Sequence, residues 1–329
     1  MFVSSIAVGL ALTTAACGGS SESPATGDKE GGDNNSSAES ITVGFIPGLA
    51  SDPFFLSMQR GAQEKADELG IKLIWQGSPD EWSPDTQIPF VDNVLTDGVD
   101  VLILNPTDPV ALQPSVEKAL AADVPVINVD QAVEDLSEVS SFLTGDNVDG
   151  GSKAAQALID EIGESGKVFI LGSEPADLTN RLRVQGFEEV IDQYPDIELI
   201  GIEYQKSSSD RAASIINTIL LANPDLDGIF AVNGTGTTGA AAALKSSDRT
   251  GDVKLIGYDA YQAAVEELEE GVVTALVAQQ PAKLGSMAVE YAYKLVTGDA
   301  ADIEDEVILE NVVLTAENLE ENAEFVYQD

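Results

Sequence analysis

Residues 41–75 read ITVGFIPGLASDPFFLSMQRGAQEKADELGIKLIW and contain the unit that the rest of the chain repeats. An apolar run at 41–46 is followed by a segment of helical periodicity that stops at Leu69-Gly70, and a second apolar run occupies 71–75. Short, continuously apolar runs on either side of an amphipathic helix are typical of parallel strands that are covered on both faces. A glycine after the last helical turn is a common helix stop. The stretch therefore predicts a strand, a helix and a second strand of an α/β protein.

The same alternation continues along the chain. Eight further apolar runs lie at 100–104, 124–129, 141–145, 167–171, 198–204, 228–232, 253–258 and 273–278. Ten strand candidates are more than a single doubly wound sheet usually contains. We therefore predict two similar doubly wound parallel-sheet domains, divided near Gly145-Asp146, where the strand–helix rhythm restarts.

Composition removes several classes of function. The 329 residues include 57 Asp and Glu against 16 Lys and Arg, a formal charge of −41, which repels nucleic acids and anionic membrane surfaces. The chain has no histidine and one cysteine, so Ser-His-Asp and Cys-His nucleophiles, His-based zinc sites and internal disulfides are excluded. Carboxylate chemistry remains open, but no acid pair is singled out. We expect no enzymatic activity, cofactor or metal, and we expect the acidic stretches 265–271 and 303–307 to form solvated helix or loop.

The first 40 residues predict export and anchoring. Residues 1–16, MFVSSIAVGLALTTAA, are too short for a typical membrane span and fit a signal peptide. Small residues directly before Cys17 resemble the lipobox of bacterial lipoproteins, which implies a lipidated cysteine. Residues 18–40 carry no large apolar side chain and predict a flexible tether behind that anchor.

Polar side chains follow most of the apolar runs. In open α/β sheets ligands bind at the carboxyl ends of the strands, so these positions are the candidates for a binding site. Each residue alone has the alternative role of capping the next helix. The recurrence of such residues in both halves favours a site. The candidates with the strongest positions are Asp52, Phe54, Phe55, Asp130, Gln131, Asn233, Asp259 and Gln279.

An ordered set of short motifs resembles the periplasmic sugar-binding proteins of the ribose-binding type, the receptors of ABC importers. The matching pieces, from about Ile41 to Leu314, are SDPFF, MQRGAQEKADELG, VLILNPTD, VPVINVD, TGDNVDGG, RVQGFEE, GIFAVN, VKLIGYDA and VAQQPAKLG. The resemblance implies a type I periplasmic binding protein, with two domains joined by a three-crossover hinge and a ligand cleft between them. The implied N-terminal domain is 41–145 plus 280–312, and the C-terminal domain is 146–279 plus 313–329.

The resemblance also assigns roles to residues of the cleft. Phe54 and Phe55 would pack on the apolar faces of a sugar ring, and Arg183 would donate charge-assisted bonds. Asp130, Asn233, Asp259 and Gln279 would bond the sugar hydroxyls. Four positions depart from the ribose pattern. Asp52 replaces a common Asn, Gln131 replaces Arg, Ser209 stands where an aromatic would complete the stacking, and Gly234 stands where an acid is usual. Trp82 is expected to supply stacking surface or to anchor its loop, and Asn180 and Arg181 are expected at the rim.

These features together predict an extracytoplasmic receptor, lipid-anchored at the cell surface or in the periplasm, that hands a neutral monosaccharide or polyol to an ABC permease. We expect a monomer that binds no nucleic acid. Two alternatives remain open. A chemoreceptor-coupled sugar sensor would have the same fold. GTGTTG at 234–239, followed by Asp259 at the next strand end, matches the dinucleotide fingerprint and would indicate an NAD-binding oxidoreductase.

Overall fold

The computed structural model describes residues 41–327, which belong to one compact unit. The predicted signal peptide, Cys17 and the tether lie outside the described residues. Within 41–327 no helix combines the length and hydrophobicity that crossing a bilayer requires.

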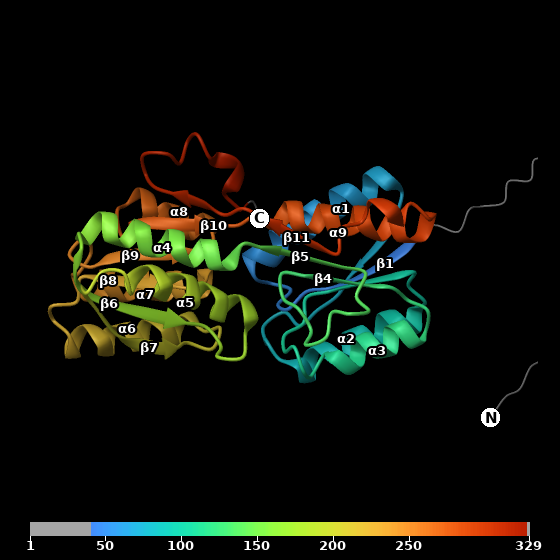
Figure 1. The fold of residues 1–329 in the computed structure, drawn as a ribbon, viewed down its shortest axis with the longest axis horizontal. Helices are drawn as coiled ribbons and strands as arrows, with labels where there is room; N and C mark the ends of the chain where they lie inside the picture. The colour runs from blue at the N-terminus through green and yellow to red at the C-terminus, as the bar shows by residue number, and fades with distance from the viewer. Residues whose placement is uncertain (1–40, 328–329) are drawn as a thin grey trace, which may run out of the picture. The chain divides into compact units, whose positions relative to one another are not determined.

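The first lobe is built on a six-stranded, wholly parallel sheet in the order β11-β5-β4-β3-β1-β2 (Figure 1). Its strands are β1 (Thr42–Ile46), β2 (Lys72–Trp75), β3 (Val101–Leu104), β4 (Val126–Val129), β5 (Ser141–Gly145) and β11 (Glu306–Leu309). Its helices are α1 (Pro53–Leu69), α2 (Pro84–Asp97), α3 (Gln113–Ala121) and α9 (Pro281–Thr297). Helices α1 and α9 pack together on one face, and α2 and α3 cover the other.

The second lobe repeats this arrangement, with a six-stranded sheet in the order β12-β10-β9-β8-β6-β7. Its strands are β6 (Ser165–Gly172), β7 (Asp196–Tyr204), β8 (Gly228–Ala231), β9 (Lys254–Tyr258), β10 (Ala275–Ala278) and β12 (Val312–Leu314). Its helices are α4 (Asn147–Ile162), α5 (Leu178–Ile191), α6 (Ser209–Ala222), α7 (Gly234–Ser246) and α8 (Gln262–Glu269). The shared strand order explains why the two halves of the sequence look alike.

Burial on both faces explains the continuously apolar strands. In β3, Val101 and Ile103 join the cluster beneath α1 and α9, whereas Leu102 and Leu104 join the cluster beneath α2 and α3. Because successive strand residues point to opposite faces, every position of such a strand must be apolar.

The chain passes between the two sheets three times. It leaves the first sheet after β5, returns between β10 and α9, and crosses again between β11 and β12. The prediction of two α/β domains joined by three crossovers is confirmed.

All ten predicted strands are present, and two strands were not predicted. The stretch 303–307 was expected to be solvated helix or loop, but Glu306 and Val307 begin β11, where Val307 is buried against β5. Strand β12 pairs antiparallel with β10, so the second sheet is not wholly parallel. The crossing explains this exception. The chain leaves the first sheet at the carboxyl end of β11 and enters the second sheet from its carboxyl edge only two residues later.

Candidate functional site

A pocket lies between the carboxyl ends of the two sheets, where strand-end residues of both lobes meet. Its lining residues are Leu49, Asp52, Phe54, Phe55, Trp82, Asp130, Gln131, Ser173, Asp177, Thr179, Arg183, Ser207, Asn233, Thr235, Asp259, Tyr261 and Gln279. In the described part of the chain, no group of Asp, Glu or Cys side chains is arranged to hold a metal ion.

Asp52 joins the start of α1 to the opposite lobe. As the N-cap residue, its Oδ1 accepts the backbone N–H of Phe54 at 2.9 Å. The same oxygen accepts the hydroxyl of Tyr261, from the second lobe, at 2.7 Å. Burial raises the pKa of Asp52 to about 6, although the Tyr261 hydrogen bond acts in the opposite direction. Asp52 is therefore a helix cap, an interlobe contact and a pocket wall at once.

Three aromatic side chains form an apolar wall of the pocket. Phe54 and Phe55 meet edge to face with ring centroids 5.1 Å apart, and Phe55 lies 6.1 Å from the ring of Trp82. Trp82 is fixed because its Nε1 donates to the carbonyl of Thr107 at 3.1 Å. Gly48 leaves room for this indole, since a Cβ there would come within 2.3 Å of Cζ3 of Trp82. Trp82 is thus anchored in its loop and lines the pocket, and its stacking on a ligand stays a prediction.

Asp130 lines the pocket and has an unpartnered oxygen. It follows β4 in the left-handed conformation, with φ of 62°, and it is only 5% exposed. Its Oδ2 accepts Nδ2 of Asn105 at 2.9 Å, while its buried Oδ1 has no hydrogen-bond partner within residues 41–327. Burial raises the pKa of Asp130 to about 7, and the positive charge of Arg183 limits that rise.

Gln131 makes the second contact between the lobes. Its Nε2 donates to Oδ1 of Asp177 and, at 3.2 Å, to Oγ1 of Thr179, both at the start of α5. The amide that stands where the ribose pattern has an arginine therefore bridges the cleft.

Among the described residues that line the pocket, Arg183 is the one cation, and it is 4% exposed. Its Nε donates to Oδ1 of Asn147 at 2.8 Å, and its Nη1 donates to the carbonyl of Val232 at 2.9 Å. The guanidinium stacks over Tyr258, with Cζ 3.8 Å from the ring centroid. Burial alone would lower the pKa of Arg183, but the surrounding acidic groups outweigh burial and raise it.

Close packing of α4 against α5 sets the position of Arg183. A Cβ at Gly151 would lie 1.9 Å from the carbonyl oxygen of Arg183, and a Cβ at Gly186 would lie 1.9 Å from that of Val148. The two glycines let the helix backbones touch. The motifs TGDNVDGG and RVQGFEE meet in this contact.

Asn233, Asp259 and Gln279 form a connected polar group on the second lobe. Oδ1 of Asn233 accepts the N–H of Gly236 at 2.9 Å, and Oδ2 of Asp259 accepts the N–H of Gly234 at 2.9 Å. Oδ1 of Asp259 also accepts Nε2 of Gln279 at 2.7 Å. Asp259 is left-handed, with φ of 70°, and it follows β9, the strand that corresponds to β4 in the other lobe.

These contacts weigh against a dinucleotide at GTGTTG. A pyrophosphate would need the free N–H groups at the start of α7. Two of those groups are already bonded to Asn233 and Asp259. A Cβ at Gly239 would lie 2.4 Å from the carbonyl oxygen of Ser209, so that glycine serves the packing of α6 against α7. The NAD alternative is not favoured.

The structure brings together most of the candidate residues but not all of them. Asn180, Arg181 and Ser209 do not line the pocket. Asn180 is buried and donates to the carbonyl of Glu174, whereas Arg181 is exposed and donates to the carbonyl of Ala176. Ser209 lines a neighbouring groove. Conversely, sequence reasoning missed the pocket residues Leu49, Ser173, Asp177, Thr179, Ser207, Thr235 and Tyr261. Asp177 and Tyr261 could have been predicted from the sequence, because each directly precedes a helical segment that follows a strand.

Two α/β lobes that close over a polar and aromatic pocket define a receptor for a small solute. The model of the periplasmic binding protein domain matches residues 43–300. The chain belongs to the periplasmic binding protein family, whose members work outside the cytoplasm, and the predicted resemblance is confirmed.

The similar proteins include transport receptors from several bacteria. The ribose import binding protein of Bacillus subtilis (strain 168) is 32% identical over 267 residues, which is 80% of this chain and 85% of that protein. An ABC transporter solute binding protein from Agrobacterium vitis, solved with α-D-tagatopyranose, matches with a TM-score of 0.84 and 30% identity over 88% of this chain and 100% of that one. A periplasmic solute binding protein from Actinobacillus succinogenes 130z, solved with D-allose, has a TM-score of 0.80 and 28% identity, and the match covers 85% of this chain and 99% of that one.

Proposed function

We propose that this protein is the extracytoplasmic receptor of an ABC importer and that it binds a neutral monosaccharide or polyol in the pocket. The observation that carries the proposal is the unpartnered Oδ1 of Asp130. A buried carboxylate oxygen without a donor is costly, and a ligand hydroxyl would satisfy it.

The rest of the pocket suits a polyhydroxylated ring. The rings of Phe54, Phe55 and Trp82 offer apolar surface to C–H groups, while the opposite wall offers carboxylates, amides and a guanidinium to hydroxyls. Four carboxylates line the pocket against the single positive charge of Arg183. This balance disfavours phosphorylated or carboxylate ligands.

Hinge closure couples binding to delivery. Contacts of one ligand with both lobes favour the closed form, and the permease would recognise the surface that closure creates. No chemical step is proposed, because the family to which the chain belongs consists of binding receptors.

We expect the purified protein to be stabilised by one sugar or polyol in a thermal-shift panel of pentoses, hexoses, deoxysugars and polyols that also contains NAD and NADP. A ligand at 100 times its Kd adds about 2.7 kcal/mol, which raises the Tm by several degrees. Isothermal titration of the hit gives Kd and stoichiometry, expected at one per chain. Stabilisation by NAD alone would overturn the proposal.

We propose that residues 1–16 are a signal peptide and that lipidated Cys17 tethers the receptor, through 18–40, to the outer face of the cell membrane as a monomer. The two binding domains would be 41–145 with 280–312 and 146–279 with 313–329. Sheet membership supports this division except at Val312, which pairs with Ala278 of the second sheet.

Cys17→Ser is expected to move the protein from the membrane fraction to the soluble exported fraction without altering sugar affinity, because it removes only the acylated thiol. Fractionation and metabolic labelling with a fatty-acid probe measure this. The matched control is Ser20→Ala, which leaves the thiol intact. Unchanged membrane association of Cys17→Ser would refute the anchor.

A further inference from the structure

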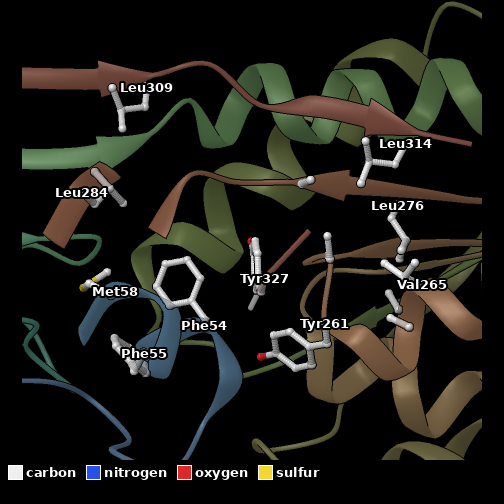
Figure 2. Close-up of a cluster of buried hydrophobic side chains, with 14 of the residues drawn as sticks. Phe54, Phe55, Met58, Tyr261, Val265, Leu276, Leu284, Leu309, Leu314 and Tyr327 are labelled. Carbon is white, nitrogen blue, oxygen red and sulfur yellow. The ribbon is translucent and has the colours of Figure 1, made fainter. Parts of the chain in front are cut away.

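The C-terminal segment brings a buried tyrosine to the ligand site. Residues 315–327 run over α8, and Tyr327 at their end is 3% exposed. Its backbone N–H donates to the carbonyl of Ala260 at 2.9 Å. Figure 2 shows its ring between those of Phe54 from the first lobe and Tyr261 from the second, at centroid distances of 6.1 and 5.8 Å.

The hydroxyl of Tyr327 has two partners, and both belong to residues that line the pocket. It accepts the backbone N–H of Gln279 at 3.1 Å, and it donates to Oδ1 of Asp259 at 3.0 Å. Since the amide of Gln279 can only donate, the single phenolic proton goes to the carboxylate. Tyr327 itself does not line the pocket. Tyr327 therefore links the carboxylate of Asp259 to the backbone at the end of β10 without lining the pocket.

We propose that Tyr327 is a positioning residue that orients Asp259 toward the ligand; this inference rests on the proposed function of the pocket. The carboxylate of Asp259 has three protein donors: Gly234 N–H on Oδ2, and Gln279 Nε2 and Tyr327 on Oδ1. Without the hydroxyl of Tyr327, Oδ1 of Asp259 would be held only by the side-chain amide of Gln279, which itself lines the pocket. A hydrogen bond to a buried carboxylate is stronger than a neutral one, so its loss loosens the carboxylate.

The test is Tyr327→Phe, which keeps the ring packing and removes only the hydroxyl. We expect Kd for the best sugar of the panel to rise about tenfold, the effect of losing one charge-assisted bond. Single-deoxy analogues measure how much each sugar hydroxyl contributes to the affinity. In Tyr327→Phe we expect this contribution to fall for one hydroxyl, the one whose hydrogen bond Asp259 accepts, and to stay unchanged for the others.

Tyr291→Phe is the control, because Tyr291 is a buried tyrosine of α9, outside the pocket, whose hydroxyl bonds the backbone of Glu304. We expect it to leave Kd unchanged.

An unchanged Kd in Tyr327→Phe, an even loss over all hydroxyls, or an equal loss in Tyr291→Phe would each overturn the positioning role. These outcomes are distinct from a failure of the proposed function, in which the unmodified protein binds no sugar.

Discussion

Asp130→Asn is expected to weaken sugar binding between about ten- and a hundredfold and, at the same time, to stabilise the sugar-free protein above neutral pH. The binding loss follows because a hydrogen bond from a ligand hydroxyl to a buried carboxylate contributes about 1.5–3 kcal/mol. The unpartnered Oδ1 of Asp130 is the acceptor that this bond needs. The asparagine can still meet Asn105 with its own oxygen, so the pocket wall should keep its shape.

The stability gain follows from the sign of the pKa shift. Asp130 has a pKa of about 7 in the folded protein, against about 3.9 in an unfolded chain. The unfolded chain therefore gives up this proton first, and stability that is fully present below about pH 4 is lost as the pH rises through 7. The difference amounts to about 4 kcal/mol at pH 8 and already includes the attraction of Arg183. Asparagine carries no charge and avoids this loss.

Thermal unfolding of Asp130→Asn and of the unmodified protein at pH 5 and pH 8 tests the effect on stability. Titration calorimetry at pH 7 tests the effect on sugar binding. We expect the Tm advantage of Asp130→Asn to be larger at pH 8 than at pH 5. Asp108→Asn is the matched control, because Asp108 caps the backbone N–H groups of Val110 and Ala111 outside the pocket. It should not change Kd. Parallel Tm profiles for Asp130→Asn and the unmodified protein would show that no buried charge is being relieved.

Arg183→Met is expected to destabilise the folded protein by about 3–5 kcal/mol and to abolish measurable sugar binding. Removing one member of a buried charged group leaves the others uncompensated. Here the carboxylates of Asp130, Asp177 and Asp259 would lose the cation that attracts them, and Asn147 would lose its donor. Because burial raises the pKa of Asp130 to about 7, this carboxylate ionises between pH 5 and pH 8, and the loss should be greater at pH 8 than at pH 5.

Chemical denaturation at the two pH values measures this loss. Arg183→Lys keeps the positive charge but lacks the planar guanidinium that donates to Asn147 and Val232 together. Its stability should therefore lie between that of the unmodified protein and that of Arg183→Met. Arg181→Met changes an exposed arginine on the same helix, and we expect less than about 1 kcal/mol there. Equal destabilisation by the two methionine variants would contradict the role assigned to the buried guanidinium.

The fold was predictable where the local pattern and the tertiary environment agree. Strands such as β3 are buried on both faces, so every residue is apolar and the run stands out. Strand β11 has the sequence EVIL at a sheet edge, with Glu306 exposed, and β12 has only three residues. Their identity as strands depends on pairing with β5 and β10, which the local sequence does not encode.

The site was predictable where a residue directly follows a strand. Asp130, Asn233, Asp259 and Gln279 lie within two residues of a strand end, and all line the pocket. Asp52 also lines it, but it caps α1 six residues after β1. Tyr327 could not be predicted in this way, because it comes from the chain's last segment and reaches the site only after that segment packs over α8. Asn180 and Arg181, expected at the rim, are not among the residues that line the pocket. They lie close to Arg183 in the chain, but helical geometry turns them toward other partners.

The two lobes are joined directly across the cleft, by Tyr261 with Asp52 and by Gln131 with Asp177 and Thr179. Both contacts are made by protein groups of the two lobes, so they contribute to the free energy of closing. A pre-closed population raises the apparent affinity, because less of the ligand's interaction energy is needed for closure. The same population excludes solute from the pocket, so entry must wait for an opening event. Tight retention and rapid loading therefore oppose each other, and we expect weaker hydrogen bonds between the lobes to favour loading at the expense of retention.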